Sequence, residues 1–359
     1  MKVLAITNMY PSPEEPDLGP FIKAQIDSQI KEGLDMDVLF VNGKKNKLNY
    51  LWGFFRMWGR LLTRRYDLIH AHYVFMGILA RFQCMYPVVL THTGAQVFHG
   101  WQAPPSRIIS RLVDRVIVRT QEMKDRMGFQ DVEIIPAGVN FELFKPMPKE
   151  ECRRKLGLPM DKKLVLWAGA YRNPRKRYDI VEKAMPILME KMDDVELILA
   201  TGHPLDVIPL YMNACDVLLL VSNAEGSPNV IKESMACNLP VVSVPVGDVP
   251  QVIGGTDGCY LCSHDPEDVA EKLQLALQWG KRTNGRENIK HLEVGVISRR
   301  LISLYEELLQ EKQKSSFAKL KFWSNDKGKY RKRYEESMSG QTKILSDAEK
   351  PAPERGDSG

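Results

Sequence analysis

The chain alternates short apolar runs with amphipathic segments along most of its length, and this alternation limits the folds open to it. Near-continuous runs of Val, Ile and Leu are typical of parallel strands that are covered on both faces. Such strands separated by helices indicate right-handed βαβ units and an open, doubly wound α/β sheet. In the first part of the chain the predicted strands are Lys2–Thr7, Met36–Val41, Asp67–His72, Val88–Thr91, Arg115–Thr120 and Glu133–Pro136.

The same pattern then begins again. A second set of predicted strands covers Leu164–Trp167, Glu196–Ala200, Val217–Val221, Val241–Val244 and Cys259–Cys262. Predicted helices cover Phe21–Lys31, Tyr50–Arg64, Asp179–Glu190, Asn229–Ala236, Pro266–Trp279 and His291–Lys312. The helix from Pro266 has Asp265 as N-cap and ends at Gly280. Two sheets in series predict two Rossmann-like domains that face a cleft, at 1–146 and 147–314, because prolines interrupt the pattern at 145–148.

Composition and length are those of a globular protein with two domains. The chain has 359 residues, 44% of them hydrophobic and 26% charged, with a net charge of +5. The N-terminal run reads as a first strand rather than a signal peptide, and no stretch approaches the roughly 20 apolar residues of a membrane span. We therefore expect a cytoplasmic protein. Residues 315–359 are basic and then polar, which favours a disordered, solvated tail over contact with lipid, and we expect no nucleic-acid partner.

Cysteine and histidine spacing raises the question of a metal. Cys259 and Cys262 have metal or redox spacing and His264 follows, but a zinc site needs a fourth ligand, so a structural, reduced pair is favoured. His70 and His72 supply only two ligands, which favours packing or cleft-lining. We expect no metal site.

The loop and helix after Val217–Val221 are the most informative segment for function. The loop contains Gly226 and Pro228 and leads into the helix at Asn229. A helix N-terminus carries free N–H groups and about half a positive charge, which suits a diphosphate. Glu225 precedes the helix and Glu233 lies about one turn into it, so the two carboxylates can accept hydrogen bonds from different ends of one elongated ligand.

The whole string resembles the Glu–seven residues–Glu signature of the family 4 retaining glycosyltransferases, which have the GT-B fold. The match runs from Glu225-Gly226-Ser227-Pro228 through Glu233 to Pro240-Val241-Val242, with Ser234 where Ala is usual and Asn238 where Gly is usual. The resemblance implies that Glu225 contacts the donor sugar and Glu233 the ribose. It also implies a donor site that includes Gly226, Ser227, Pro228, Asn229 and Val230.

Other segments carry the same resemblance over roughly residues 1–310. The opening segment Thr7–Phe21 is similar to a family loop in which a glycine, here Gly19, allows close approach of the donor phosphate. Residues 66–72 resemble the family's third-strand motif. Residues 134–146 resemble its interdomain segment, with Asn140 where Asp is usual.

A cationic cluster follows the first strand of the second set. The family usually has Gly-Arg and then Lys-Gly in this segment, and Lys176 matches that Lys. Ala170 occupies the Arg position and Arg177 the Gly position, so Arg172 is the candidate for the missing guanidinium. We expect Lys176 and Arg172 to offset the negative charge of the leaving diphosphate. With Glu225, which we expect to contact the donor sugar, they form the predicted catalytic set. The alternative is that this segment is a solvated basic loop.

The first domain departs further from the family pattern His-Gly-x-Asp. Here the chain reads Thr91-His92-Thr93-Gly94-Ala95-Gln96, so that Thr93 falls at the His position and Gln96 at the Asp position. His92 and Thr93 are the acceptor-side candidates, although His92 is expected on the opposite strand face from Thr93.

The segment Tyr50–Arg65 is apolar, aromatic and basic. As a helix it could lie on a membrane surface near a lipid-linked acceptor, or it could be a core helix with snorkelling arginines.

The resemblance implies a retaining transferase of hexosyl type that is independent of metal and uses a nucleoside-diphosphate sugar as co-substrate, with no other cofactor. The resemblance also implies a glycan or lipid-linked hydroxyl as acceptor, in bacterial surface glycan synthesis, with a peripheral membrane contact at the inner face. Two alternatives stay open. One is a non-catalytic sugar-nucleotide-binding partner of a true transferase, suggested by Ala170, Thr93 and Gln96. The other is a sugar-nucleotide epimerase on the same fold.

Overall fold

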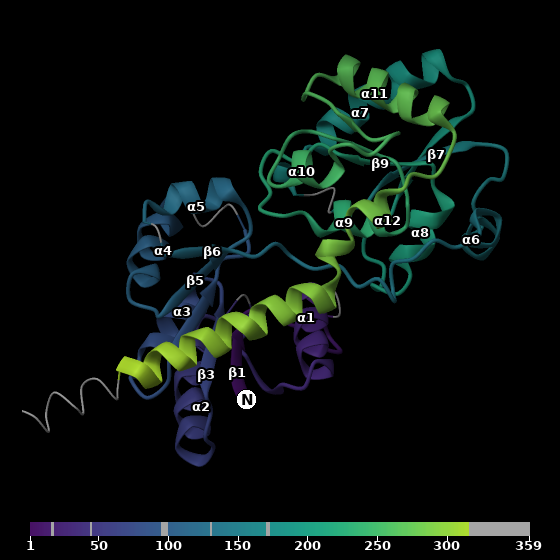
Figure 1. Cartoon of the computed structure of the whole chain (residues 1–359). Coiled ribbons are helices and arrows are strands. Elements are labelled where there is room, and N and C mark those ends of the chain that lie inside the picture. Colours follow the sequence, from purple (N-terminus) through teal and green to yellow (C-terminus); the bar gives the residue numbers. More distant parts are fainter. Residues whose placement is uncertain (16–17, 44, 95–99, 130, 170–172, 316–359) are drawn as a thin grey trace, which may run out of the picture. The chain divides into compact units, whose positions relative to one another are not determined.

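The computed structural model describes residues 1–15, 18–43, 45–94, 100–129, 131–169 and 173–315 (Figure 1). Met1–Tyr305 form one compact unit, and the described residues from 306 to 315 belong to a second. The division expected at residues 146 and 147 lies inside the first unit and stays a prediction, as does a disordered tail, whose residues from 316 on lie outside the described part.

The first sheet is built from parallel strands in the order β2-β1-β3-β4-β5-β6. Its strands are β1 (Lys2–Thr7), β2 (Asp35–Phe40), β3 (Leu68–His72), β4 (Val88–Thr91), β5 (Arg115–Val118) and β6 (Val132–Ile134). The helices that follow them are α1 (Pro20–Lys31), α2 (Asn49–Thr63), α3 (Val74–Arg81), α4 (Ala103–Ser110) and α5 (Gln121–Met127). Strand side chains such as Leu4, Ile69 and Leu90 are fully buried beneath them.

The second sheet is also parallel, in the order β11-β10-β9-β7-β8. Its strands are β7 (Lys163–Trp167), β8 (Val195–Leu199), β9 (Val217–Leu220), β10 (Val241–Ser243) and β11 (Tyr260–Leu261). Its helices are α6 (Lys149–Leu156), α7 (Tyr178–Lys191), α8 (Ile208–Ala214), α9 (Asn229–Ala236), α10 (Val249–Ile253), α11 (Pro266–Trp279) and α12 (Gly285–Asn288), and a last helix covers 294–315. None of the helices in the described part of the chain combines the length and the apolarity that a membrane span needs.

Every predicted strand is confirmed to within two residues, and α9 and α11 begin and end where the sequence predicts. The caps explain the precision at α11, because the Asp265 carboxylate accepts the Glu267 N–H at 3.1 Å and Gly280 adopts a left-handed φ of 65°. Short helices such as α3 and α8 were not predicted, since they have only 8 and 7 residues and their periodicity is weak.

The last helix begins at residue 294 rather than at His291, so that prediction is wrong at its start. Lys290–Leu292 form a 3-10 turn instead. Here the backbone forms a bridge to Val139 instead of a helical turn. Val139 N–H donates to Leu292 O, and Val294 N–H donates to Val139 O, both at 2.9 Å. The Glu293 carboxylate then accepts the Gly295 N–H at 2.7 Å and caps the helix.

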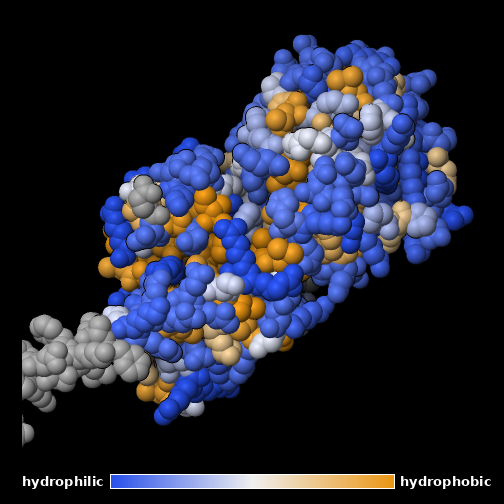
Figure 2. Space-filling model, viewed as in Figure 1, coloured by the Kyte–Doolittle hydropathy of each residue, from blue (hydrophilic) through white to orange (hydrophobic). Residues whose placement is uncertain are grey.

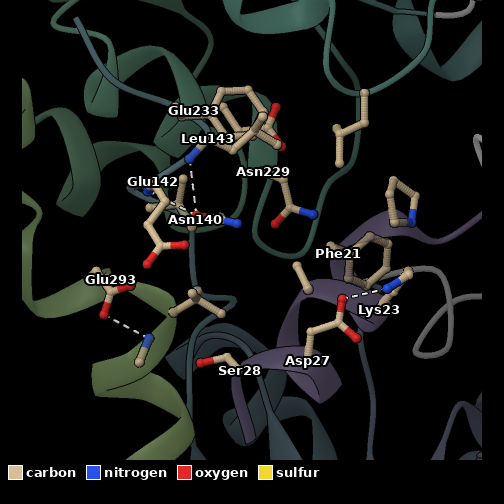
Figure 3. A pocket seen from close by; sticks show the side chains of 18 of the residues that line it. Phe21, Lys23, Asp27, Ser28, Asn140, Glu142, Leu143, Asn229, Glu233 and Glu293 are labelled. Atoms are coloured by element: carbon tan, nitrogen blue, oxygen red, sulfur yellow. Dashed lines mark hydrogen bonds and ion pairs between the residues drawn. The ribbon is translucent and has the colours of Figure 1, made fainter. Parts of the chain in front are cut away.

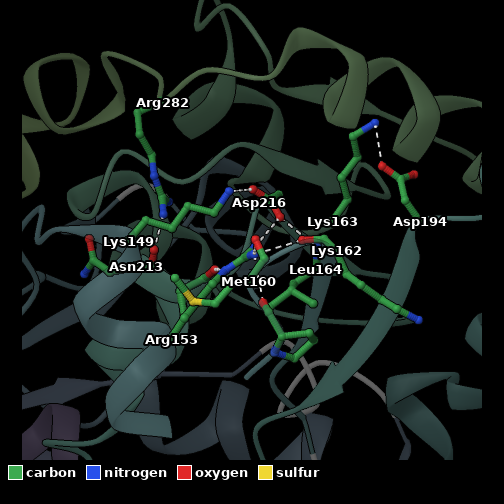
Figure 4. Close-up of polar contacts among 12 residues, drawn as sticks. Lys149, Arg153, Met160, Lys162, Lys163, Leu164, Asp194, Asn213, Asp216 and Arg282 are labelled. Atoms are coloured by element: carbon green, nitrogen blue, oxygen red, sulfur yellow. Dashed lines mark hydrogen bonds and ion pairs between the residues drawn. The ribbon is translucent and has the colours of Figure 1, made fainter. Parts of the chain in front are cut away.

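A buried polar network anchors the start of β7 (Figure 4). The Asp216 carboxylate accepts hydrogen bonds from Arg153 Nη2 at 2.8 Å and Leu164 N at 2.7 Å, and it pairs with Lys149. Arg153 also donates to the carbonyl oxygens of Ala214 and Lys162, both at 2.9 Å. Because a buried guanidinium needs partners for its donors, this network fixes α6 against the second sheet.

Both sheets share one strand order when each is numbered from its own first strand. In each, the chain turns first to one side of the starting strand and then to the other, which places a topological switch point between β1 and β3 and another between β7 and β9. In open parallel sheets ligands bind beyond the carboxyl ends of the strands at such a point. The loops after β7 and β9 are therefore the first place to look for a site.

Candidate active site

An ion pair joins the two loops at the second switch point. Lys176 Nζ in the loop after β7 lies 2.6 Å from Glu225 Oε1 in the loop after β9. The side chains are 26% and 21% exposed, so both can be reached by a ligand. A backbone hydrogen bond from Asn223 N to Arg175 O, at 2.9 Å, fixes the loops against each other. Two residues 49 positions apart, predicted separately from motifs, thus share one site.

The Lys176 loop ends in a 3-10 turn, Pro174–Lys176, that presents the ammonium group. Asn173 Oδ1 accepts the Arg175 N–H at 3.2 Å, and Lys176 N donates to Asn173 O at 2.9 Å. Arg177 follows with a left-handed φ of 54°, and its guanidinium pairs with Asp179 at 2.9 Å. Arg172, predicted as a second cation, and Ala170 lie outside the described residues.

Helix α9 opens beside Glu225 with its first-turn N–H groups uncapped by any side chain. Pro228 is its N-cap and makes no side-chain cap hydrogen bond, and the first turn holds no acidic residue. Asn229 Oδ1 is buried and has no hydrogen-bond partner among the described residues. A helix entrance of this kind combines anion-binding N–H groups with an unsatisfied polar atom, which is the chemistry of a ligand site.

Sequence reasoning missed a buried ion pair beneath this entrance. Lys232 is fully buried, and its Nζ lies 3.0 Å from Asp248 Oδ2 and also contacts Ser227 Oγ. Burial lowers the pKa of Lys232, and the Asp248 carboxylate opposes that shift. Ser227 Oγ in turn donates to Asp248 Oδ2 at 2.6 Å. The Ser227 hydroxyl, predicted to bind donor, is therefore already engaged in positioning the loop. A lysine between Ile231 and Glu233 was the signal in the sequence.

A cavity of about 660 Å³ lies next to the start of α9 and contains the second motif carboxylate (Figure 3). Glu233 and Asn229 line it from α9, and Figure 3 shows Phe21 and Asp27 of α1 on the facing wall. Burial raises the pKa of Glu233 to about 7, opposed by the neighbouring Lys232 ammonium group. The protonated form of this carboxyl group is therefore favoured more strongly than in an exposed glutamate.

The cations that line this cavity are all paired within it. Lys23 pairs with Asp27 at 2.5 Å, Lys31 with Glu142 at 2.8 Å, and Arg299 with Glu32 at 2.6 Å. The carboxylates left over in the lining belong to Asp206, Glu233 and Glu293. This region therefore offers hydrogen-bond acceptors for hydroxyl or amino groups, as a nucleoside would require, rather than a second phosphate site.

Gly19 occupies a position that no other residue fits without strain. It is the N-cap of α1 with φ 71°, and a Cβ added there would lie 2.8 Å from Met9 Cβ and 2.9 Å from the Met9 carbonyl oxygen. The sequence predicts that Gly19 allows close approach of a donor phosphate. In the structure, Gly19 lies close to the backbone of Met9 in the preceding loop. The neighbouring Pro20 and Phe21 line the cavity, so Gly19 positions one of its walls.

The acceptor-side candidates lie in the first sheet. His92 is fully buried, its Nε2 lies 2.8 Å from Ser110 Oγ, and burial lowers its pKa to about 4. Thr93 is half-buried, and Gln96 lies outside the described residues.

Tyr73, directly after β3 at the first switch point, has φ 73° and ψ 154°, a backbone conformation that costs a non-glycine residue about 1–3 kcal/mol.

Both histidines of β3 are fully buried, but neither ring nitrogen of His72 has a hydrogen-bond partner among the described residues. His70 Nδ1 is 2.6 Å from Tyr305 Oη, and His70 Nε2 is 2.7 Å from Thr91 Oγ1, so both ring nitrogens are engaged. Across the described residues, no three His, Cys, Asp or Glu side chains converge as a metal site would require. All six cysteines are free thiols, and burial raises the pKa of Cys259 to about 11 and of Cys262 to about 12.

The fold and the switch-point site define a class of protein. A sucrose-phosphate synthase of Thermosynechococcus elongatus superposes with a TM-score of 0.70 at 18% identity, over 87% of this chain and 100% of that one. HepE of Anabaena, solved with UDP-glucose, gives a TM-score of 0.64 at 16% identity, over 86% and 100%. The chain has the GT-B fold of glycosyltransferases.

The sequence defines the family. The family described as Glycosyltransferase Family 4 matches residues 3–143, and that described as Glycosyl transferases group 1 matches residues 200–278. The chain belongs to the family 4, group 1 glycosyltransferases. Among curated relatives, a D-inositol 3-phosphate glycosyltransferase of Thermobispora bispora is 26% identical over 63% of this chain and 65% of its own, so the alignment spans slightly less than two thirds of that relative. TuaC of Bacillus subtilis, assigned to teichuronic acid biosynthesis, is 24% identical over 76% and 88%.

Proposed function

We propose that the protein transfers a hexosyl group from a nucleoside-diphosphate sugar to a hydroxyl acceptor with retention of anomeric configuration. The observation that supports this most directly is the placement of Lys176 and Glu225 together at the second switch point, beside the open N-terminus of α9. Glu233, farther along the same helix, lines the adjoining cavity. These groups match the parts of a nucleotide sugar: a sugar, a diphosphate and a ribose.

In this proposal the Lys176–Glu225 ion pair opens when donor binds. Lys176 Nζ then faces the diphosphate, and the Glu225 carboxylate accepts hydrogen bonds from the sugar hydroxyls. As the bond between the anomeric carbon and the diphosphate oxygen breaks, negative charge grows on the leaving group. The ammonium group and the first-turn N–H groups of α9 stabilise that charge, which is the role a divalent cation has in other transferases, so we propose metal-independent transfer.

The cavity beside Glu233 is proposed to hold the nucleoside. Its 660 Å³ is within the usual range for small-ligand pockets, and carboxylates are suited to ribose hydroxyls. HepE was solved with UDP and with UDP-glucose, which makes UDP-hexoses the first donors to try. For the acceptor we propose a glycan or lipid-linked hydroxyl, and for the setting bacterial surface glycan synthesis on the cytoplasmic side of the membrane. The curated relatives named for inositol phosphate and teichuronic acid support an acceptor with hydroxyl groups.

Substitution of the two paired residues tests the proposal. We expect Lys176→Ala and Glu225→Gln each to lower the transfer rate about 10²–10³-fold, the usual loss when one preorganised charge-stabilising group is removed. The measurement is release of nucleoside diphosphate from a panel of nucleotide sugars, with acceptor present. Lys281→Ala removes a cation that lies over Trp279, away from the predicted site, and serves as the control.

Unchanged transfer in both variants would exclude this site. Thermal stabilisation of the protein by a nucleotide sugar, without transfer to any acceptor, would instead favour the non-catalytic partner suggested by Thr93 and by residues 96 and 170.

A further inference from the structure

We propose that α2 and the apolar groove beside the end of α3 form a docking surface for an anionic lipid bilayer. This goes beyond the proposed reaction, because the surface lies apart from the Lys176–Glu225 site and needs no sugar donor. The first observation is that the exposed apolar side chains are unevenly distributed along the chain. In the described part of the chain, ten of the seventeen exposed large hydrophobic residues lie between Leu48 and Leu112. Figure 2 shows apolar atoms reaching the surface at α2 beside strongly hydrophilic ones.

The outer side of α2 is apolar along its whole length. At about 3.6 residues per turn, the residues at positions 48, 51, 52, 55 and 62 fall on one side of the helix. Trp52 is 64% exposed, Phe55 56% and Leu62 75%. The opposite side carries Gly53 and Met57 and is buried. The inner side of α2 packs against the core of the first sheet. The outer apolar stripe is therefore not part of that packing.

The charged residues of the segment that contains this stripe are all basic. Residues 44–65 contain seven Lys and Arg and no Asp or Glu. Arg60 and Arg64 both pair with the single carboxylate of Asp37, at 3.2 and 2.6 Å. Lys45, Lys47 and Arg65 are exposed, and no ion pair to a described residue engages them. An ordinary solvent-facing surface mixes both signs. A helix with Trp, Phe and Leu on one side and cations flanking its two ends instead suits an anionic lipid interface.

A second apolar feature continues the stripe. Phe54 packs edge-on against Phe82 at 5.8 Å between ring centroids, which joins α2 to the end of α3. Beyond Phe82 lies a groove of about 310 Å³ whose lining is apolar except for Arg81. Arg81 is bound to the carbonyl oxygens of Leu112 and Gln83, at 2.7 and 3.0 Å. The groove is therefore an acyl-chain-like environment next to the stripe, and Ile108 and Leu112 extend its exposed edge.

These features favour a bilayer over a protein partner. Trp and exposed cations together suit the boundary between headgroups and acyl chains, where the ring sits at headgroup depth and each nearby Lys or Arg adds to the attraction. The surface would hold the enzyme beside an acceptor that is carried in the membrane.

The test is co-sedimentation of the full chain with phosphatidylcholine vesicles, with and without phosphatidylglycerol. We expect binding when phosphatidylglycerol is present, weakened by added salt. Trp52→Ser together with Phe55→Ser should weaken binding by at least about tenfold. Lys45→Gln, Lys47→Gln and Arg65→Gln combined should weaken it by about a hundredfold, and only on the anionic vesicles.

Matched controls separate docking from general apolarity and from misfolding. Met160→Ser with Leu275→Ser removes two other exposed apolar side chains, 52% and 39% exposed, and should leave vesicle binding unchanged. Nucleotide-sugar binding by each variant reports whether the fold is intact. Equal binding by the α2 variants and the wild type would overturn the proposal. So would a concentration-dependent dimer that the Trp52→Ser, Phe55→Ser variant loses, since this face would then belong to a second copy of the chain.

Discussion

Arg177 and Asn238 both adopt left-handed backbone conformations, with φ 54° and φ 56°. These are positions where the related motifs carry glycine, and the left-handed region costs other residues about 1–2 kcal/mol. Each side chain offsets that cost locally. Asn238 follows Cys237, the C-cap of α9, and its Oδ1 accepts the Arg286 backbone N–H at 2.9 Å. Arg177 pairs with Asp179 and donates to Asn223 Oδ1 at 3.1 Å. Both departures from the motif therefore lie in a backbone conformation that glycine adopts without strain.

At the same scale, Glu233 predicts a pH dependence of donor binding. Burial raises its pKa to about 7, so the folded state holds a proton that the unfolded chain releases near its ordinary value of 4.5. Its contribution to stability is present below pH 4.5 and is lost as pH rises towards 7. Ribose recognition favours the ionised acceptor, so we expect nucleotide affinity to rise by up to about tenfold between roughly pH 6 and 8.

Calorimetric titration with a nucleoside diphosphate across this range measures the effect. Glu233→Gln should bind more weakly and with a flat profile, because the amide does not titrate. A slope that persists in the variant would assign the pH dependence to another group.

Among the elements, the loops after β7, β9 and β10 form one unit around the start of α9. Lys232 of α9 and Asp248, which precedes α10, hold the Ser227 hydroxyl between them. The loop after β10 also approaches Gly226 so closely that a Cβ on Gly247 would lie 2.4 Å from the Gly226 carbonyl oxygen. The position of Glu225 thus depends on a loop that carries no predicted catalytic residue.

Gly247→Ala should therefore lower transfer activity by at least about tenfold, because the methyl group displaces the backbone at Gly226 and misplaces the neighbouring carboxylate. Gly255→Ala is the matched control, since Gly255 has a similar φ of 71° but no atom within 4 Å of the added methyl group. The control should lose about 1 kcal/mol of stability and keep its kcat. Equal kcat loss in both variants would show that strain alone, and not the contact, is responsible.

Across the whole molecule, contacts between distant parts of the sequence close the compact unit. Tyr305 in the last helix is fully buried, and its hydroxyl meets Gln29 Nε2 at 3.0 Å and His70 Nδ1 at 2.6 Å. Arg119 after β5 is also buried and donates to the carbonyl oxygens of Ile135 and Pro136, at 3.0 and 3.2 Å. Burial lowers the pKa of Arg119 to about 10, opposed in part by carboxylate and phenol groups including Asp248. These polar groups must stay paired for the unit to be stable.

Tyr305→Phe should lower the free energy of unfolding by about 1–3 kcal/mol, because it leaves buried polar atoms of Gln29 and His70 without a partner. Urea unfolding followed by circular dichroism measures this. Tyr260→Phe removes a hydroxyl that has no hydrogen bond to a described residue, and it should change stability by less than about 0.5 kcal/mol. If the two variants unfolded alike, the Tyr305 hydroxyl would have no net role.

The sequence alone determined the strands and the long helices, and it singled out three residues of the proposed site, Lys176, Glu225 and Glu233. These features are local: apolar periodicity, N-caps and a contiguous motif each lie within a few turns of chain, where near neighbours decide conformation. The left-handed positions of Arg177 and Asn238 could also be anticipated, because the related motifs have glycine there.

Only the tertiary structure decided the strand order, and with it the meeting of Lys176 and Glu225 across the second switch point. The tertiary structure also decided the Lys232–Asp248 ion pair and the hydrogen bonds of Tyr305. Each joins residues far apart in the chain, so no local pattern encodes it. Such contacts depend on which side chains packing brings together, and burial then sets their charge and hydrogen bonding.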